Sequence, residues 1–146
     1  MGTWHVAQRF EWSEEASVGI PVLDAQHKRL FELLGEVMRS SAPGAAGAST
    51  EALAEVKAYA DQHLEQEELL LRVRGYPEYA EHKAEHDAYR EKAAVLQSQA
   101  GRRDFNVRLV NFITEWWRFH ILVTDQRYAK FFRAKEGRPS APLDAA

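Results

Sequence analysis

Residues 82–86 read His82-Lys83-Ala84-Glu85-His86, in the middle of a polar, helix-compatible segment that extends from position 78 to position 100. Two histidines four residues apart lie one turn above each other on one helical face, so their rings can converge on a single metal ion. The pair also belongs to a stripe with the spacing of a buried seam, formed by Tyr79, His82, His86, Tyr89, Ala93 and Leu96. A zinc site, an iron site and plain packing all fit this pair.

The composition restricts the classes of protein to which the chain can belong. Its 146 residues are typical of one domain with a substantial core. The net charge is −3 and both signs are scattered along the chain, which argues against a nucleic-acid partner. The absence of cysteine excludes disulfides, thiolate metal sites and iron–sulfur clusters. No apolar run has the length of a membrane span or forms a signal segment, so we expect a cytoplasmic protein.

The chain divides into an N-terminal extended arm (1–20), a helical domain (21–133) and a flexible tail (134–146). Phe10 and Trp12 are apolar anchors of the arm. Within the domain the pattern predicts helices over about 24–39, 51–74, 78–100 and 104–132, with Asp24, Thr50 and Asp104 as expected N-caps. Four long amphipathic helices joined by three turns predict an all-α, up-down-up-down four-helix bundle.

Every predicted helix carries a histidine or a carboxylate within its apolar stripe. The first stripe includes His27, the second includes His63 and Glu67, and the fourth consists of Leu109, Phe112, Trp116, His120 and Val123. Glu65 and Glu68 fall off the second stripe, so we expect them to face solvent. A rise of about 1.5 Å per residue from the shared turns places the polar seam residues of all four helices at one level. Unrelated core histidines would not align in this way.

This set of side chains suits two metal ions better than one. Five imidazoles and two carboxylates exceed the four ligands of a closed zinc site, whereas they suit two six-coordinate ions that share carboxylates. A ferritin-like di-iron site would require Glu-x-x-His pairs and more carboxylates. Asp125 follows His120 by five residues, about 140° around an ideal helix, so spacing alone leaves its participation open.

In combination these motifs resemble the hemerythrins, specifically the single-domain bacterial type. The resemblance covers residues 12–132 and rests on the segments Trp12 with Ser17-Val18-Gly19-Ile20, Asp24-Ala25-Gln26-His27, His63-Leu64-Glu65-Gln66-Glu67-Glu68, Tyr76-Pro77 with His82-x-x-x-His86, and Trp116-x-x-x-His120-Ile121-x-x-x-Asp125. All seven ligand positions of the family are present.

The resemblance implies a left-handed bundle with two iron ions (Fe2+ or Fe3+) and a bridging oxo or hydroxo group at mid-depth. It implies that one iron is saturated by His82, His86 and His120. By the same resemblance, the other iron is held by His27 and His63 and keeps one open position. Glu67 and Asp125 would bridge the two irons, which gives Asp125 the role that spacing could not assign.

Five apolar residues are candidates for an apolar wall that would line the O2 site and exclude water: Leu30, Phe31, Leu71, Trp116 and Trp117. At helical spacing they are equally compatible with ordinary core packing. Two of them depart from the family's pattern, because Leu71 stands where the family often has Met and Trp117 stands where an aliphatic residue is more usual. Neither departure affects a predicted ligand.

The resemblance implies reversible O2 binding by a carrier, store or delivery protein that is not an enzyme. We expect a monomer with O2 as its partner and a cytoplasmic oxygenase as a candidate recipient. Two alternatives remain open: an O2 sensor, and a di-iron redox enzyme acting as a peroxidase, in nitric-oxide handling or as a ferroxidase. The chain shows no attached signalling module, which counts against the sensor, and its histidine-rich set favours binding over oxidation of a substrate.

Overall fold

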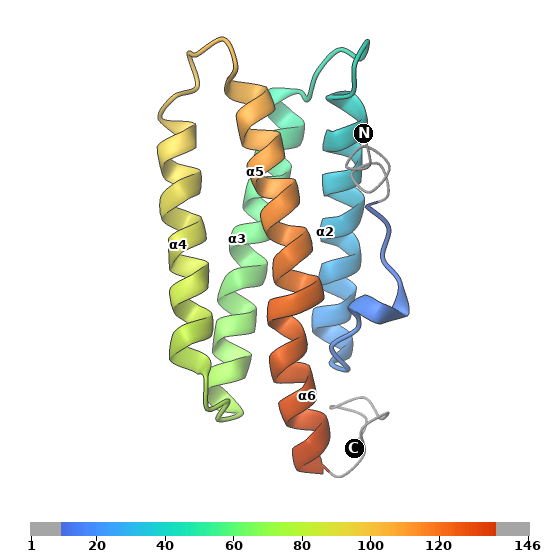
Figure 1. Cartoon of the computed structure of the whole chain (residues 1–146), viewed down its shortest axis with the longest axis vertical. Coiled ribbons are helices and arrows are strands. Elements are labelled where there is room, and N and C mark those ends of the chain that lie inside the picture. The colour runs from blue at the N-terminus through green and yellow to red at the C-terminus, as the bar shows by residue number, and fades with distance from the viewer. Residues whose placement is uncertain (1–9, 137–146) are drawn as a thin grey trace.

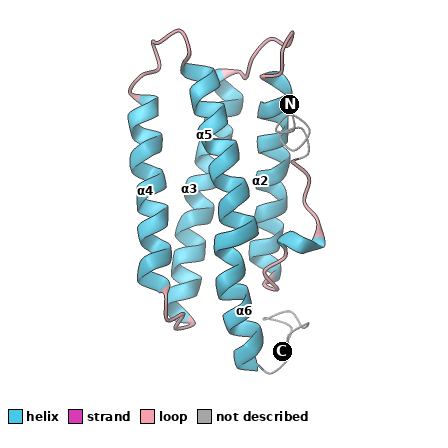
Figure 2. Ribbon diagram, viewed as in Figure 1, coloured by secondary structure: helices cyan, strands magenta, loops and turns pink. Residues whose placement is uncertain are grey.

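The computed structural model describes residues 10–136, which contain helices and no strand (Figures 1 and 2). The elements are a 3₁₀ turn η1 (Glu14–Ala16), α2 (Pro21–Ser40), α3 (Thr50–Val73), α4 (Tyr79–Gln97), α5 (Phe105–Phe119), a π-helical turn η2 (His120–Thr124) and α6 (Asp125–Glu136). Helix α6 continues the axis of α5, so four rods run alternately up and down (Figure 1). The prediction of an all-α four-helix bundle is confirmed.

The helix starts differ from the sequence prediction at two of three caps. Ile20 is the N-cap of α2, and Asp24 lies inside its first turn, where its carboxylate accepts bonds from Ser17 Oγ at 2.6 Å and from the Val18 N–H at 2.8 Å. The predicted cap at Asp24 is therefore wrong, and this side chain instead ties the arm to α2. Ser49 rather than Thr50 caps α3, by accepting a bond from the Ala52 N–H at 3.0 Å. Asp104 does occupy the N-cap position of α5.

The described helices begin and end close to the limits of the predicted helical domain, and the division into arm, domain and tail stays a prediction. Helix α2 begins at Pro21, and Phe10 of the preceding arm packs edge-on against Phe31 with ring centroids 4.8 Å apart. Helix α6 continues to Glu136, three residues into the segment predicted as tail. The rest of that tail and residues 1–9 of the arm lie outside the described residues. No described helix combines the length and hydropathy of a membrane-spanning segment.

The fourth rod is the least regular of the four. Its buried face follows Leu109, Ile113, Trp117 and His120, whereas Val123 of the predicted stripe is 43% exposed. Phe112 and Trp116 of that stripe are only partly buried. The prediction was wrong at Phe112 and Trp116 because the buried face of α5 follows Leu109, Ile113 and Trp117 instead, and it was wrong at Val123 because it assumed 3.6 residues per turn throughout. The π turn at His120–Thr124 widens the helix and shifts the register of the residues that follow it.

The core consists of two apolar clusters with polar side chains between them. The larger cluster lies toward the α2–α3 and α4–α5 loops and includes Leu34, Leu64 and Trp117. The smaller one surrounds the α3–α4 turn and the start of α2, and it includes Ile20, Leu71 and Tyr128. The buried histidines and acidic residues lie along the helices between these two clusters. This layer is the level that the sequence predicted.

Candidate metal centre

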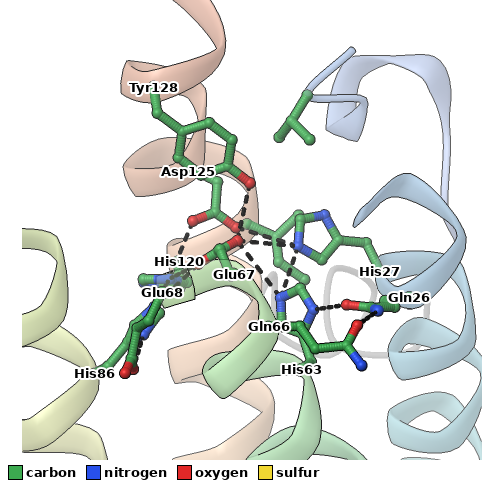
Figure 3. Close-up of polar contacts among 12 residues, drawn as sticks. Gln26, His27, His63, Gln66, Glu67, Glu68, His86, His120, Asp125 and Tyr128 are labelled. Carbon is green, nitrogen blue, oxygen red and sulfur yellow. Dashed lines mark hydrogen bonds and ion pairs between the residues drawn. The ribbon is translucent and has the colours of Figure 1, made fainter. Parts of the chain in front are cut away.

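Seven polar side chains from all four rods meet in the buried layer, and Figure 3 labels all of them except His82. None of the seven is more than 5% exposed. They are His27 on α2, His63 and Glu67 on α3, His82 and His86 on α4, His120 in η2 and Asp125 at the start of α6. These are the seven residues predicted as metal ligands. Donor atoms of six of them form two groups suited to a metal ion, which share Glu67, and the Asp125 carboxylate contacts histidines of both groups.

The first group contains three histidines from α4 and η2. The Nε2 atoms of His86 and His120 are 3.0 Å apart. Glu67 Oε1 lies 2.8 Å from His82 Nε2 and 3.1 Å from His86 Nε2. Asp125 Oδ1 lies 3.1 Å from His120 Nε2. Three imidazoles and two carboxylate oxygens thus surround one position.

The second group contains the two histidines of α2 and α3. Their Nε2 atoms are 3.1 Å apart. Glu67 Oε2 lies 3.5 Å from His63 Nε2, and Asp125 Oδ2 lies 3.3 Å from His27 Nε2. This group therefore has two imidazoles and two carboxylate oxygens, one donor fewer than the first. Both carboxylates turn one oxygen to each group, which is the arrangement of bridging ligands.

The π turn explains how Asp125 reaches this layer. The Asp125 N–H donates to the carbonyl of His120, five residues earlier, where an α-helix would bond to the residue four earlier. The wider turn brings residues five apart onto the same face. On an ideal α-helix Asp125 would lie about 140° away from His120. Regular spacing could not predict this local change of helix type.

The orientation of the imidazoles tests whether a metal ion fits. The Nδ1 atom of His86 lies 2.7 Å from the Glu68 carboxylate, and that of His63 lies 2.6 Å from Gln26 Oε1. Both acceptors require a proton on Nδ1, which leaves the Nε2 lone pairs of neutral rings pointing into the layer. Two nitrogens bound at right angles about 2.1 Å from one ion lie about 3.0 Å apart. The observed Nε2 pairs have this spacing, so a cation fits between them.

The two acidic oxygens of Asp125 give a second test. Both are fully buried and make no hydrogen bond in the part of the chain that the structure describes, although His120 and His27 Nε2 lie 3.1 and 3.3 Å from them. A buried carboxylate without hydrogen bonds is costly unless a cation neutralises it. The donor set, imidazole with carboxylate and no thiolate, suits iron as well as zinc. The residues present therefore fit a pair of metal ions.

The histidines and carboxylates of the layer shift one another's pKa values. Burial opposes ionisation of Asp125 and so does the nearby Glu67 charge, but contacts with His120 and His82 outweigh both and lower its pKa to about 2. Burial opposes protonation of His82, yet its contact with Asp125 and its bond to Glu67 raise its pKa to about 9. His63 differs, because burial is the dominant influence and lowers its pKa. Without metal, the carboxylates thus hold protons on histidines that a cation would displace.

Comparison with known proteins places the chain in a family. The model described as "Hemerythrin HHE cation binding domain" matches residues 18–132. The chain belongs to the hemerythrin family. It is 33% identical over 125 residues to a bacteriohemerythrin of Stenotrophomonas maltophilia, with 84% of this chain and 81% of that protein covered. A bacteriohemerythrin of Clostridium acetobutylicum is 27% identical over 126 residues, covering 82% and 98%. One from Methylococcus capsulatus is 29% identical over 116 residues, covering 78% and 88%. No solved structure gives a significant match.

Membership in the hemerythrin family confirms the resemblance seen in the sequence. The family model names cation binding, which agrees with the donor groups of the buried layer. It also agrees with the expectation of a binding protein rather than an enzyme. The assignment of individual side chains to individual ions remains a proposal, since it depends on their geometry alone.

Four residues around the layer were missed by the sequence prediction. Glu68, expected to face solvent, is only 12% exposed in its side chain and contacts both His86 and Arg90. Gln26 contacts His63, and Glu85 Oε2 lies 3.4 Å from His120 Nδ1. Tyr128 donates a bond to Glu67 Oε2 at 2.8 Å. The sequence did offer one indication of these contacts. Polar residues next to a ligand in the sequence lie at the edge of the buried helix face, where they can reach a ligand histidine.

The five candidate wall residues occupy different surroundings in this hemerythrin. The Trp116 ring stacks on His120 with centroids 4.3 Å apart, and the Trp117 ring lies 5.8 Å from that of His63. Leu30 and Leu71 are fully buried in the two apolar clusters on opposite sides of the layer. Phe31 lines a surface groove beside the arm, together with Phe10, Trp12 and Lys28. The tryptophans thus contact ligand rings directly, and the wall role of all five stays a prediction.

Proposed function

We propose that this hemerythrin binds O2 reversibly at a non-haem centre of two iron ions joined by an oxo or hydroxo bridge. The observation that carries the proposal is the pair of facing imidazole groups, with Nε2 atoms 3.0 and 3.1 Å apart, that share two carboxylates. Zinc in closed sites takes four ligands around one ion, whereas this layer offers seven side chains around two positions. Membership in the hemerythrin family supports the choice of iron.

The proposed ligand sets follow from the two donor groups. His82, His86 and His120 would hold one iron, and His27 and His63 would hold the other. Glu67 and Asp125 would contact both, so the first iron would have five protein ligands and the second would have four. With one bridging oxygen, a six-coordinate preference would be satisfied at the first iron and would leave one position open at the second. That open position, beside α2 and α3, is the proposed site of O2.

When bound, the two ferrous ions supply the electrons that O2 binding requires. The protein's contribution is to hold the geometry and to keep proton donors away. The pKa of Tyr128 is raised well above its usual value by burial and by the charges of Asp125 and Glu67, so its hydroxyl keeps the proton that it donates to Glu67. The Trp117 indole N–H is likewise committed to Tyr89 Oη at 3.0 Å. Neither group is a source of protons for bound O2.

We propose a carrier, store or delivery role for this O2 binding, with a cytoplasmic oxygenase as a candidate recipient and a monomer as the working form. Three matched relatives named bacteriohemerythrin support the carrier reading, because the chain covers 81–98% of their lengths. The histidine-rich ligand set supports binding over substrate oxidation.

An optical experiment tests this function. Iron-loaded protein, reduced without oxygen, is exposed to O2 and then purged with inert gas through several cycles. A visible absorption band that appears with O2 and disappears on purging is expected. His63→Ala should abolish the band because it removes one of two histidines from the open side, whereas Glu65→Ala, on the exposed face of α3, should keep it. Rapid conversion to a stable diferric form that consumes peroxide would contradict the proposal and favour the redox enzyme.

A further inference from the structure

The Nδ1 atoms of the ligand histidines, which point away from the layer, contact groups that differ in charge. On the side with three histidines, His86 Nδ1 lies 2.7 Å from Glu68 Oε2, and Arg90 holds the same Glu68 oxygen at 2.8 Å. His120 Nδ1 lies 3.4 Å from Glu85 Oε2, a charge contact without a hydrogen bond within residues 10–136. Glu85 is fixed in turn by a bond from Thr124 Oγ1 at 3.3 Å. Both of these imidazoles therefore face a carboxylate on the side away from the layer.

The side with two histidines lacks such carboxylates. The His63 Nδ1–H donates to the neutral amide oxygen of Gln26 at 2.6 Å, and the Gln26 amide group donates onward to Gln66 Oε1 (Figure 3). His27 Nδ1 is buried and has no hydrogen-bond partner within residues 10–136. One imidazole on this side is thus supported by a neutral group, and the other by none.

This difference changes the strength of the histidines as ligands. A carboxylate that accepts the Nδ1–H polarises the ring and makes Nε2 a stronger donor to a metal ion. It also fixes the tautomer and the plane of the ring. A neutral amide does the same more weakly, because bonds to an ionised group are about twice as strong as neutral ones. The ligand strength should therefore fall from His86 through His63 to His27.

We propose that these outer contacts make the ion held by His27 and His63 the exchangeable ion of the pair, with Glu68 and Gln26 as the positioning residues that set the difference. The inference rests on the proposed function, since it requires two bound ions. The smaller number of ligands on this side acts in the same direction. The outer contacts add to that difference, and they can be exchanged without touching any ligand.

The physical consequence is an ordered loss of metal. The ion at the open position leaves first, and a one-ion protein that retains His82, His86 and His120 as ligands remains folded. The same ion is the one proposed to bind O2, so loss of O2 binding should precede loss of the second ion. By this inference, the weak support that Gln26 gives His63 sets the lifetime of the two-iron form.

Iron release tests the inference without relying on O2 binding. Reduced, two-iron protein is mixed with an excess of a coloured ferrous chelator under anaerobic conditions, and the colour is followed with time. The wild-type chain should release iron in two phases of equal amplitude. Glu68→Gln should accelerate the slow phase by about 10-fold or more, the usual effect of losing such a partner. Gln26→Glu should slow the fast phase, while Gln66 turns its amide to donate to the new carboxylate.

Matched variants separate the bond from the charge. Glu65→Gln and Gln62→Glu change the charge of exposed residues on α3 in the same two directions, and both should leave the two phases unaltered. Far-ultraviolet circular dichroism of each loaded variant establishes that it is folded. A second readout is the amplitude of the O2 band, which should decay with the fast phase only.

The outcomes distinguish this inference from the proposed function. A chain that never takes up two irons contradicts the proposed function itself. A chain that takes up two irons and binds O2, but releases both in one phase, overturns the inference alone. It is also overturned if Glu68→Gln accelerates the fast phase selectively, or if Gln26→Glu leaves the fast phase unchanged.

Discussion

The larger apolar cluster and the polar layer are buried to the same degree but are stabilised in opposite ways. Leu34 and Leu64 in the cluster, like Glu67 and Asp125 in the layer, are completely buried. Burial of a leucine side chain stabilises the fold by about 1.5–3 kcal/mol. Burial of an ionised carboxylate destabilises it unless a counter-charge is present. One region of the bundle is therefore complete in itself, and the other requires its ligand.

The largest effect is expected from removing the carboxylate that both donor groups share. Glu67→Ala should abolish binding of both irons and lower the free energy of unfolding by about 3–5 kcal/mol, because it leaves buried histidines without their counter-charge. Iron analysis and denaturant unfolding measure the two effects. Glu65→Ala on the same helix serves as the control. A Glu67→Ala protein that keeps two irons would contradict the claim that the polar layer, unlike the apolar cluster, depends on its bound metal.

A substitution in the cluster should act on stability alone. Leu34→Ala leaves a cavity in well-packed surroundings and should lower the free energy of unfolding by about 2–5 kcal/mol. The loss should be similar with and without metal, and the iron content should stay unchanged. Unfolding of both forms, with iron analysis of the loaded one, checks this. Loss of iron from a folded Leu34→Ala protein would show that the two regions are not separable.

Alkaline pH should weaken the metal-free layer while the metal-loaded protein resists. The pKa of His82 is 6.5 in an unfolded chain and about 9 in the fold without metal, where burial is outweighed by the contact with Asp125 and the bond to Glu67. Because the pKa is higher in the fold, protonated His82 contributes its full stabilisation below pH 6.5, and this contribution disappears as the pH rises through 9. Unfolding of the metal-free protein between these values should show the decline.

The loaded protein provides the control for that experiment, because a metal ion replaces the proton on Nε2. Its stability should change little over the same alkaline range. Acid should instead release its iron, since ligands must be deprotonated to bind. A metal-free protein whose stability rises from pH 6.5 to 9 would contradict the charges assigned to the layer.

The smallest of these effects is expected at Tyr128. Tyr128→Phe removes the bond to Glu67 Oε2 and keeps the ring in the apolar cluster around the α3–α4 turn. A hydrogen bond to a charged group contributes about 1.5–3 kcal/mol, so the free energy of unfolding should fall by that amount or less. Iron content should remain the same, as measured by metal analysis. A complete loss of iron would assign Tyr128 a larger role than orienting the carboxylate.

The same comparison explains which features the sequence could predict. Apolar periodicity places the cluster and the histidines of α2, α3 and α4, because those three helices keep regular 3.6-residue turns. It fails at η2, where the π turn moves Val123 to the surface and Asp125 into the layer. A change of helix type depends on what the layer stabilises across the bundle, and no single-helix pattern contains that information.

The outer contacts of the histidines were also beyond the sequence. Glu68 is one residue past a seam position, where a solvent-facing side chain is the normal interpretation. Only the packing of α4 against α3 brings His86 and Arg90 to it. Asp24 illustrates the same limit at a helix start, since its bonds to Ser17 and Val18 depend on the path of the arm. Seam positions follow from periodicity, whereas partners across helices follow from the tertiary structure.

Metal analysis of the purified, reconstituted protein tests the central claim of a paired metal centre most directly. Inductively coupled plasma measurement should give about two irons per chain in the wild type and close to none in Glu67→Ala, with the ferrous protein handled anaerobically. Two irons in the wild type, lost together with Glu67, are the predicted result. A single zinc per chain, or iron that Glu67→Ala retains, would contradict the account.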